Sequence, residues 1–283
     1  MKVFNSKENI FNTIEGFKAQ NKKVGFVPTM GALHAGHLAL VSKALKENDL
    51  VVVSVFVNPT QFDKNEDLEK YPRTLERDIN LLKTLSSTNI IIYVPSVKDI
   101  YGENIEALNF DFDGLENEME GKFRSGHFDG VGTVVKRLFE IINPHNAYFG
   151  EKDFQQLQII KKLVEKFHLS INVIGCEIYR EKSGLALSSR NERLKPEYLK
   201  VAPTIYKILK VAKEKFGTQS AKKITGWVVK EFAKQKLLEL EYFVIADIKT
   251  LKEIKRKSDK KVYRAFIAVY ADEIRLIDNI ALN

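Results

Sequence analysis

Short runs of apolar, mostly β-branched residues recur along the first half of the chain and predict buried strands. Between them, apolar residues recur every three or four positions, which predicts amphipathic helices. The expected strands are 24–28, 50–57, 90–94, 147–149 and 171–175, and the expected helices are 38–46, 71–85, 131–142 and 154–167. Such alternation is typical of an α/β fold with a parallel, doubly wound sheet. We therefore expect one α/β domain over residues 1–178, with its ligand beyond the carboxyl ends of the strands.

The pattern changes after about Tyr179. Two long helical stretches, 196–216 and 219–240, precede three strand-like runs, 242–248, 262–270 and 273–280. The last two runs are joined around Ala271 and Asp272 and predict a hairpin. We expect a small α+β domain over residues 179–283.

Composition narrows the class of protein. The 283 residues are 44% hydrophobic and 29% charged, which allows a large core and argues against disorder. The longest apolar runs, such as 50–57, fall far short of the roughly 20 residues that span a bilayer. Residues 1–11 lack the features of a secretory signal. Cys176 is the single cysteine, so no internal disulfide can form, and we expect a cytoplasmic protein.

The formal net charge of +8 favours an anionic partner. A nucleotide and a weak nucleic-acid surface are both compatible with it. Much of the excess lies in segments such as 249–261, which read more simply as a solvated face.

The first candidate site is the loop after the first expected strand, which runs into a helix. Backbone N–H groups and the helix dipole attract phosphate at such a place, glycine allows close approach, and imidazoles add donors. A helix cap and a core histidine are the alternative reading. The loop residues are Met30, Gly31, Ala32, Leu33, His34, Ala35, Gly36 and His37.

Two further loops leave expected strands at the same edge. Asn58 and Gln61 follow one strand, where neutral amides can bind a hydroxy acid, although Asn-Pro is also a common turn opener. After another strand, Gly150 permits a close backbone approach, Lys152 suits phosphate and Asp153 suits ribose hydroxyls. Gln156 follows one turn later. A charged, solvent-facing helix start is the alternative for this segment.

Two further loops, at residues 188–190 and 124–127, carry hydrogen-bond donors. Ser188, Ser189 and Arg190 suit a triphosphate whose charge moves toward pyrophosphate, unless they form an ordinary interdomain loop. Arg124 and His127 could contact a carboxylate or phosphate, although glycine-flanked loops of this kind are common.

Read together, the chain resembles the pantothenate synthetase family. The resemblance spans essentially the whole chain, including the closing strand 275–280, and rests on five ordered motifs: Pro-Thr-Met-Gly-Ala-Leu-His-Ala-Gly-His, Phe-Val-Asn-Pro-Thr-Gln-Phe, Gly-His-Phe-Asp-Gly-Val, Phe-Gly-Glu-Lys-Asp-Phe-Gln-Gln and Gly-Leu-Ala-Leu-Ser-Ser-Arg-Asn.

The resemblance implies a Rossmann-like nucleotidyltransferase domain with a small C-terminal lid, in a homodimer. It implies condensation of pantoate with β-alanine through an acyl-adenylate, using ATP and Mg²⁺ and neither nucleic acid nor membrane. No residue is expected to be a protein metal ligand.

The same resemblance assigns roles to residues. It implies that ATP is bound by residues 30–37, Gly150, Glu151, Lys152, Asp153, Tyr179, Leu187, Ser188, Ser189 and Arg190, and that Gln61 and Gln156 bind pantoate, with Pro28, Asn58, Arg124 and His127 beside them. The catalytic group would be His34, His37, Lys152, Ser188, Ser189 and Arg190, acting as donors and cations and not as nucleophiles.

One departure and two alternatives remain open at this stage. Ser125 follows Arg124 where the family usually has proline, so the orientation of Arg124 is not fixed by a rigid residue. Adenylyl transfer to a nucleotide or tRNA-linked acceptor would also use a His-x-Gly-His element, but we find no appended basic or aromatic module for RNA. A non-catalytic nucleic-acid binder would use the positive charge alone.

Overall fold

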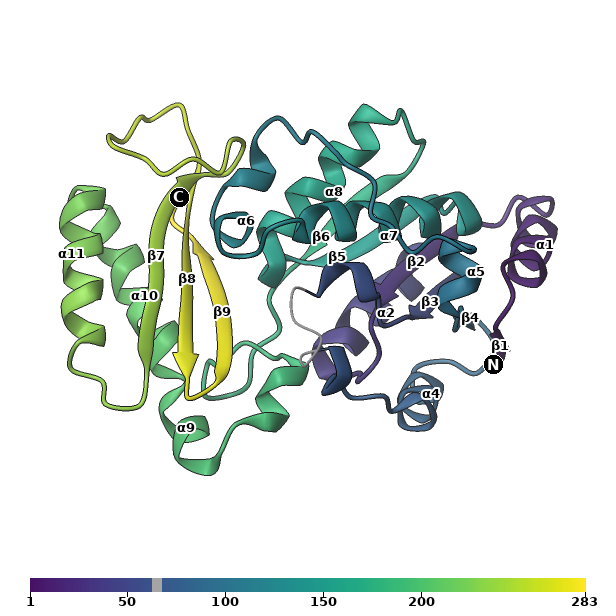
Figure 1. Ribbon diagram of the computed structural model, residues 1–283, viewed down its shortest axis with the longest axis horizontal. Helices are drawn as coiled ribbons and strands as arrows, with labels where there is room; N and C mark the ends of the chain where they lie inside the picture. The colour runs from purple at the N-terminus through teal and green to yellow at the C-terminus, as the bar shows by residue number, and fades with distance from the viewer. Residues whose placement is uncertain (63–67) are drawn as a thin grey trace. The chain divides into compact units, whose positions relative to one another are not determined.

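The computed structural model describes residues 1–62 and 68–283, which group into two compact units (Figure 1). The first comprises Met1–Glu151 and Gln156–Glu177, and the second comprises Lys152–Gln155 and Ile178–Asn283. The short segment Lys152–Gln155 therefore has most of its neighbours in the second unit, although it lies within the strand and helix alternation of the first.

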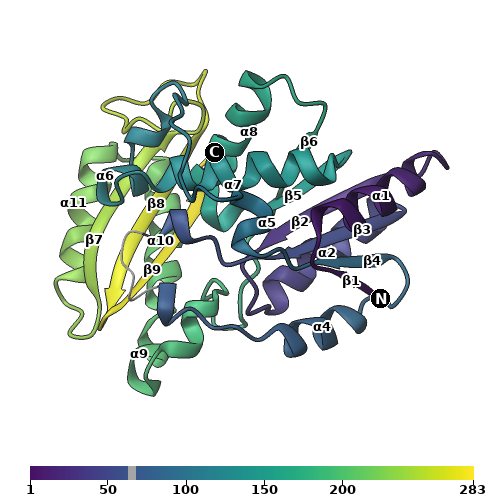
Figure 2. The same ribbon diagram turned by 45° about the vertical axis from the view of Figure 1, so that its right-hand side comes forward.

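In the described residues of the first unit, six strands form one sheet in the order β1-β4-β3-β2-β5-β6. Every neighbouring pair is parallel, which confirms the expected α/β class. Figure 2 shows β1 at the edge of the sheet beside β4. The strands are β1 (Lys2–Phe4), β2 (Val24–Thr29), β3 (Leu50–Val55), β4 (Ile90–Tyr93), β5 (Asn146–Gly150) and β6 (Asn172–Cys176).

Helices cover both faces of this sheet because the strands are apolar on both sides. On one face, Val51, Val53 and Ile92 pack with Val41 and Leu82 of two helices, α2 and α4. On the other face, the ring of Phe139 in α7 packs against those of Phe26 and Phe149 at centroid distances of 6.2 and 6.4 Å. The helices are α1 (Lys7–Lys18), α2 (Ala35–Glu47), α4 (Leu75–Lys83), α5 (Val97–Tyr101), α6 (Glu120–Phe123), α7 (His127–Ile142) and α8 (Phe154–Lys166), with short 3₁₀ turns at Pro59–Gln61, Leu115–Asn117 and Glu151–Asp153.

The order in which the chain adds strands to the sheet reverses between β2 and β5, although all the strands stay parallel. From β2 the chain proceeds outward through β3 and β4 on one side, and β5 and β6 lie on the other. The β2–β3 register runs to Thr29 and Val55, whereas the β2–β5 register ends, within these fully described strands, at Phe26 and Ala147. Pro28, which has no N–H to donate, lies beyond that point. The two strands thus separate at their carboxyl ends, which is where ligands bind in folds of this kind.

The β1 strand and the α1 helix at the start of the chain were not expected from the apolar pattern. The strand is three residues long and mostly exposed, and the helix buries only Ile10 and Ile14. A single narrow stripe of this kind gives a weak periodic signal.

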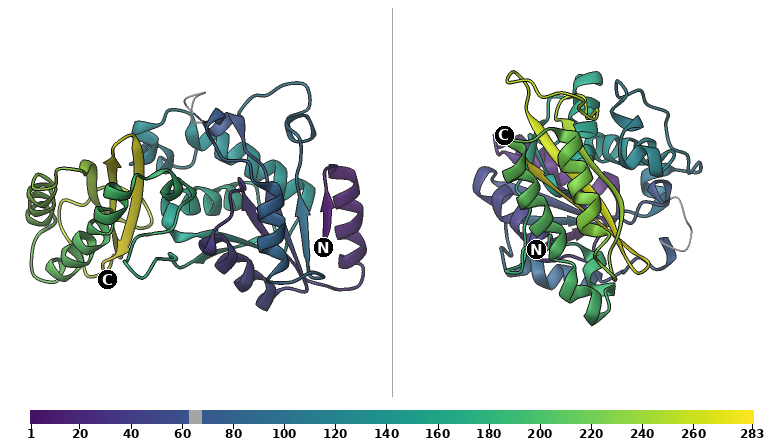
Figure 3. Two further views of the ribbon diagram at one scale, coloured as in Figure 1. Left: turned by 90° about the horizontal axis from the view of Figure 1, so that it is seen from below. Right: turned by 90° about the vertical axis from the view of Figure 1, so that its left-hand side faces the viewer.

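The second unit, all of whose residues are described, has an antiparallel sheet of β7 (Glu239–Asp247), β8 (Tyr263–Ala271) and β9 (Ile274–Ala281). The expected hairpin is confirmed, with Asp272 in the left-handed region at φ 58°. Figure 3 shows two helices against the same face of this sheet. The helices of this unit are α9 (Pro196–Val201), α10 (Thr204–Phe216) and α11 (Ala221–Phe232), preceded by a 3₁₀ turn at Ser189–Arg193.

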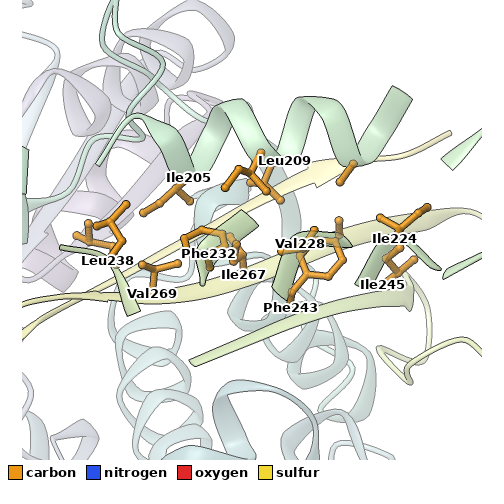
Figure 4. Packing of buried hydrophobic residues seen from close by; sticks show 14 of the residues in the cluster. Ile205, Leu209, Ile224, Val228, Phe232, Leu238, Phe243, Ile245, Ile267 and Val269 are labelled. Atoms are coloured by element: carbon orange, nitrogen blue, oxygen red, sulfur yellow. The ribbon is translucent and has the colours of Figure 1, made fainter. Parts of the chain in front are cut away.

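Both long helices predicted for the second unit are shorter in the structure than the sequence pattern indicated. The stretch 196–216 is broken at Ala202 and Pro203, because proline cannot donate within a helix. The stretch 219–240 ends as a helix at Phe232, and Leu238 and Leu240 instead pack with the strands. Figure 4 shows that core, in which Leu209, Val228 and Phe232 meet Phe243 and Ile267.

The buried amide of Asn48 lies at the centre of a hydrogen-bond network beside Gly25 of β2. Asn48 donates to the Ala44 carbonyl and to the Tyr148 hydroxyl at 2.8 and 2.7 Å, and accepts from Asn146 at 2.8 Å. A Cβ on Gly25 would lie 2.6 Å from the Asn48 Nδ2 atom. Only glycine leaves room for this network at that position.

We predict that Gly25→Ala lowers the free energy of unfolding by about 1–3 kcal/mol, the usual effect of overpacking a core. Urea unfolding followed by circular dichroism measures it. Gly16→Ala is the matched control, because nothing lies within 4 Å of its added Cβ. In that helix the control should be neutral or stabilising by up to about 1 kcal/mol. Equal stability of the two variants would contradict the assigned packing.

Candidate active site

The loop after β2 is held in a tight left-handed turn. Gly31 and Ala32 have φ values of 81° and 49°. The buried carboxylate of Asp78 in α4 accepts the N–H groups of Ala32 and Leu33 at 2.9 and 2.8 Å. Thr74 donates to the same carboxylate at 3.1 Å. Asp78 thus fixes the loop backbone. Sequence reasoning missed it, because an acidic residue in the first turn of a helix is ordinary.

The two histidines of this loop cap the helix that follows. His34 Nδ1 accepts the Gly36 N–H at 3.1 Å, and His37 Nδ1 accepts the His34 N–H at 3.3 Å. The two rings lie 4.1 Å apart with a tilt of 32°. Since both Nδ1 atoms accept, each neutral ring carries its proton on Nε2. The expected alternative, helix capping, is therefore present for both histidines.

Gln61 connects the second loop to the first. Its Nε2 atom donates to the Met30 sulfur at 2.7 Å, and its Oε1 atom accepts from Asn58 at 3.3 Å. The structure therefore brings together a residue expected at the acid and one expected at the nucleotide. Pro28 lies in β2, opposite Ser54 of β3.

Asn58 lies under this loop, with only 1% of its surface exposed. Its amide donates to Gln61 and to the Gly130 carbonyl, and its oxygen accepts from Thr60 and, at 2.5 Å, from Tyr101. These bonds use the full capacity of the amide. Burial raises the pKa of the Tyr101 hydroxyl, which keeps it protonated as a donor. Asn58 is thus placed to shape the loop from within.

Arg124 and His127 hold the backbone of Gln61. Arg124 donates to the Gln61 carbonyl at 3.1 Å and lies 3.2 Å from His127 Nε2. Because a guanidinium can only donate, Nε2 accepts, and His127 donates from Nδ1 to the same carbonyl at 3.0 Å. The orientation of Arg124 is therefore set by Gln61 and His127, although Ser125 stands where the family that the sequence resembles usually has proline.

The residues of the third candidate loop belong to different units. Gly150 ends β5 beside β2, Glu151 follows it, and Gln156 lies in the first turn of α8, all in the first unit. Lys152 and Asp153 belong to the second unit. The Lys152 ammonium lies 3.6 Å from the Asp153 carboxylate, and the Lys152 carbonyl accepts from Asn279 of β9 at 2.9 Å.

The fourth candidate loop, in the second unit, forms a small closed turn. The Leu187 N–H donates to the Tyr179 carbonyl at 3.0 Å, and Arg180 pairs with Ala186 as an antiparallel bridge. Ser188 then caps the 3₁₀ turn by accepting the Arg190 N–H at 3.3 Å. Tyr179, Leu187 and the Ser-Ser-Arg residues are thus brought together, with the Tyr179 side chain 47% exposed.

A buried ion pair supports that loop and was not expected. Arg180 binds Asp278 of β9 through two parallel hydrogen bonds of 2.6 and 2.8 Å. It also donates to the Gly184 carbonyl, and its Cζ atom lies 3.7 Å from the centroid of the Tyr206 ring. The signal in the sequence was a charged and an amide residue, Asp278 and Asn279, between the apolar residues Ile277 and Ile280.

Cys176, at the end of β6, is a buried free thiol. Burial raises its pKa, which makes it unreactive. Across residues 1–62 and 68–283, no group of three or more His, Cys, Asp or Glu side chains could hold a metal ion. None of the helices in the described residues has the length and apolar character needed to cross a membrane.

Comparison with known proteins identifies the family. The model of pantoate-beta-alanine ligase matches residues 2–281. The chain is 57% identical to the pantothenate synthetase of Christiangramia forsetii, with all of both chains covered. Its structure resembles the pantothenate synthetase of Thermus thermophilus, at a TM-score of 0.91 and 38% identity over 100% and 99% of the chains. A pantoate-beta-alanine ligase from Francisella tularensis, complexed with beta-gamma ATP and beta-alanine, gives a TM-score of 0.81 and 37% identity over 100% and 98%. The chain therefore belongs to the pantoate-β-alanine ligase family.

Proposed function

We propose that this ligase uses ATP to activate pantoate as pantoyl-adenylate and then transfers the pantoyl group to β-alanine. The contact between Gln61 and Met30 carries the proposal, because it joins an amide suited to a hydroxy acid with a loop suited to nucleotide phosphates. The Francisella relative, whose complex contains beta-gamma ATP and beta-alanine, supports the same choice of substrates.

In the first unit, residues 30–37 would bind the nucleotide. The N-terminus of α2 offers backbone N–H groups and a favourable dipole to phosphates. His34 and His37 would donate from Nε2, since their Nδ1 atoms already accept backbone N–H groups. Gly150 and Glu151 would line the same nucleotide from the end of β5.

Pantoate would be bound by the amides of Gln61 and Gln156. Pro28, Asn58, Arg124 and His127 would act beside them, and three of these four already hold Gln61 through hydrogen bonds. Their contribution is to keep the Gln61 amide in one orientation before the substrate arrives.

In the second unit, Lys152, Ser188, Ser189 and Arg190 would bind the triphosphate, with Asp153 at the ribose and Tyr179 and Leu187 at the adenine. Hydroxyls and cations of this kind stabilise charge that moves toward the departing pyrophosphate. Mg²⁺ would enter with ATP as its counter-ion, because it is usually held by substrate phosphates and water.

The reaction has two steps. A pantoate carboxylate oxygen bonds to the α-phosphorus, and the bond from that phosphorus to the bridging oxygen breaks, releasing pyrophosphate. The β-alanine nitrogen then bonds to the acyl carbon, AMP leaves with the electrons of the acyl–oxygen bond, and the amine loses a proton. We extend the proposal to a cytoplasmic homodimer, in line with the family resemblance, and light scattering measures the oligomeric state.

The adenylate is tested with pantoate labelled with ¹⁸O in its carboxylate. We predict that label appears in AMP, and that pyrophosphate exchanges into ATP with pantoate present and β-alanine absent. Mass spectrometry and radiolabelled exchange measure the two results. ADP and phosphate as products would instead indicate an acyl phosphate and would overturn the mechanism.

His37→Ala should lower turnover by roughly 10²–10³, the loss expected on removing one preorganised donor. His37→Asn is the matched variant, because its amide oxygen reaches the position of Nδ1 and retains the bond from the His34 N–H, while nothing replaces Nε2–H. We expect Asn to restore thermal stability but not turnover. If Asn restored both, the histidine would be a helix cap and not a phosphate donor.

Asp78→Asn should lower kcat/KM for ATP by about tenfold or more, because an amide N–H₂ would face one of two loop N–H groups and about 1–3 kcal/mol would be lost. Asp99→Asn is the control. Its carboxylate likewise accepts from one backbone N–H, that of Lys7, and from one hydroxyl, that of Tyr93, but it touches no candidate loop. The control should lose stability and keep its KM for ATP. Similar kinetic losses in both variants would refute a specific role for Asp78.

A further inference from the structure

Two adjacent polar residues of β9 are buried in the second unit. Asp278 and Asn279 are 5% and 2% exposed, and the residues that flank them in the strand, Ile277 and Ile280, are apolar. Asn279 Nδ2 donates to the Lys152 carbonyl at 2.9 Å, and its Oδ1 accepts from Arg264. The amide thus makes a donor and an acceptor bond at once, which neither a carboxylate nor an apolar side chain can do.

The segment that Asn279 holds is short. Two residues after Lys152, the Phe154 ring lies under the Arg264 guanidinium, with 4.1 Å between Cζ and the ring centroid. The centroid of the same ring lies 5.9 Å from that of Phe266. Arg264 therefore contacts both Asn279 and Phe154. Because the backbone of Lys152 is fixed by these contacts, the position of its side chain depends on Asn279.

Asp278 holds a second segment through Arg180. The carboxylate takes both arms of the guanidinium and also accepts the N–H of Asn279 at 2.7 Å. Arg180 in turn donates to the carbonyls of Gly184 and Asn279. One dipeptide of β9 is therefore bonded to the Lys152 segment and to the turn that spans Tyr179 and Leu187.

We propose that Asp278 and Asn279 are positioning residues that fix Lys152 and the Tyr179–Arg190 segment relative to each other, so that their phosphate-binding groups are arranged before ATP binds. The proposal rests on the proposed function, since it needs Lys152 to contact the nucleotide. Preorganisation of this kind lowers the cost of binding and of charge stabilisation.

The first test replaces Asn279 with Asp. The carboxylate keeps the bond from Arg264 and places an oxygen against the Lys152 carbonyl. We expect the affinity for a non-hydrolysable ATP analogue, measured by calorimetry, to fall about ten- to a hundredfold, as when a group that orients a functional residue is removed. Asn283→Asp is the control, because Asn283 also donates to a lysine carbonyl, that of Lys261, and accepts a backbone N–H, but it lies at the chain end. The affinity of this control variant for the ATP analogue should be unchanged.

A double-mutant cycle with Lys152→Ala tests whether Asn279 acts through Lys152. If it does, Asn279→Asp weakens binding in the otherwise unchanged protein and has less than about a threefold effect when Lys152 is already alanine. The same fold-loss in both backgrounds would overturn the inference. Unchanged binding in Lys152→Ala alone would instead show that the proposed role of Lys152 is wrong.

If the melting temperature of Asn279→Asp shows that this variant does not fold, Arg180→Lys is the second test of the positioning role. Lysine keeps the charge but cannot form two parallel bonds with Asp278. We expect a similar loss of affinity, with the melting temperature close to that of Asn283→Asp. Full affinity in Arg180→Lys would overturn the proposal.

Discussion

The separation of β2 from β5 is the constraint on which the first unit depends. The two strands are paired at Gly25 and Phe26, and then diverge where Pro28 cannot donate. Their carboxyl ends are left without shared backbone bonds, so the loops that follow must satisfy their own N–H groups. Asp78 does this for Ala32 and Leu33, and the histidine pair does it at the start of α2. The candidate loops are ordered because these backbone groups have been given partners.

Much of this arrangement could be predicted from sequence. Buried strands of a parallel sheet are apolar on both faces, so apolar runs such as 50–57 and 90–94 predict strands directly. Loops at the carboxyl ends of such strands are the natural places for a ligand, which is how residues 30–37 and Gln61 were found. The class of fold followed from these local patterns, whereas the family followed from the resemblance carried by five ordered motifs.

The supporting residues could not be predicted, because their partners lie far away in the chain. Asp78 is 46 residues from Ala32, and Asp278 is 98 residues from Arg180. In sequence each looks like an ordinary surface charge. Asn58 and His127, whose chemistry predicted contact with a ligand, also form hydrogen bonds to Gln61, and that supporting role had no signal in the sequence. Side-chain chemistry alone does not distinguish a group that meets the substrate from one that orients its neighbour.

The lone thiol of Cys176 has a practical consequence. It is buried at the end of β6, and burial raises its pKa, so we expect a mild maleimide treatment to leave it unmodified. A cysteine introduced at an exposed position in each unit would then be the preferred site of a fluorophore, without first removing a native residue.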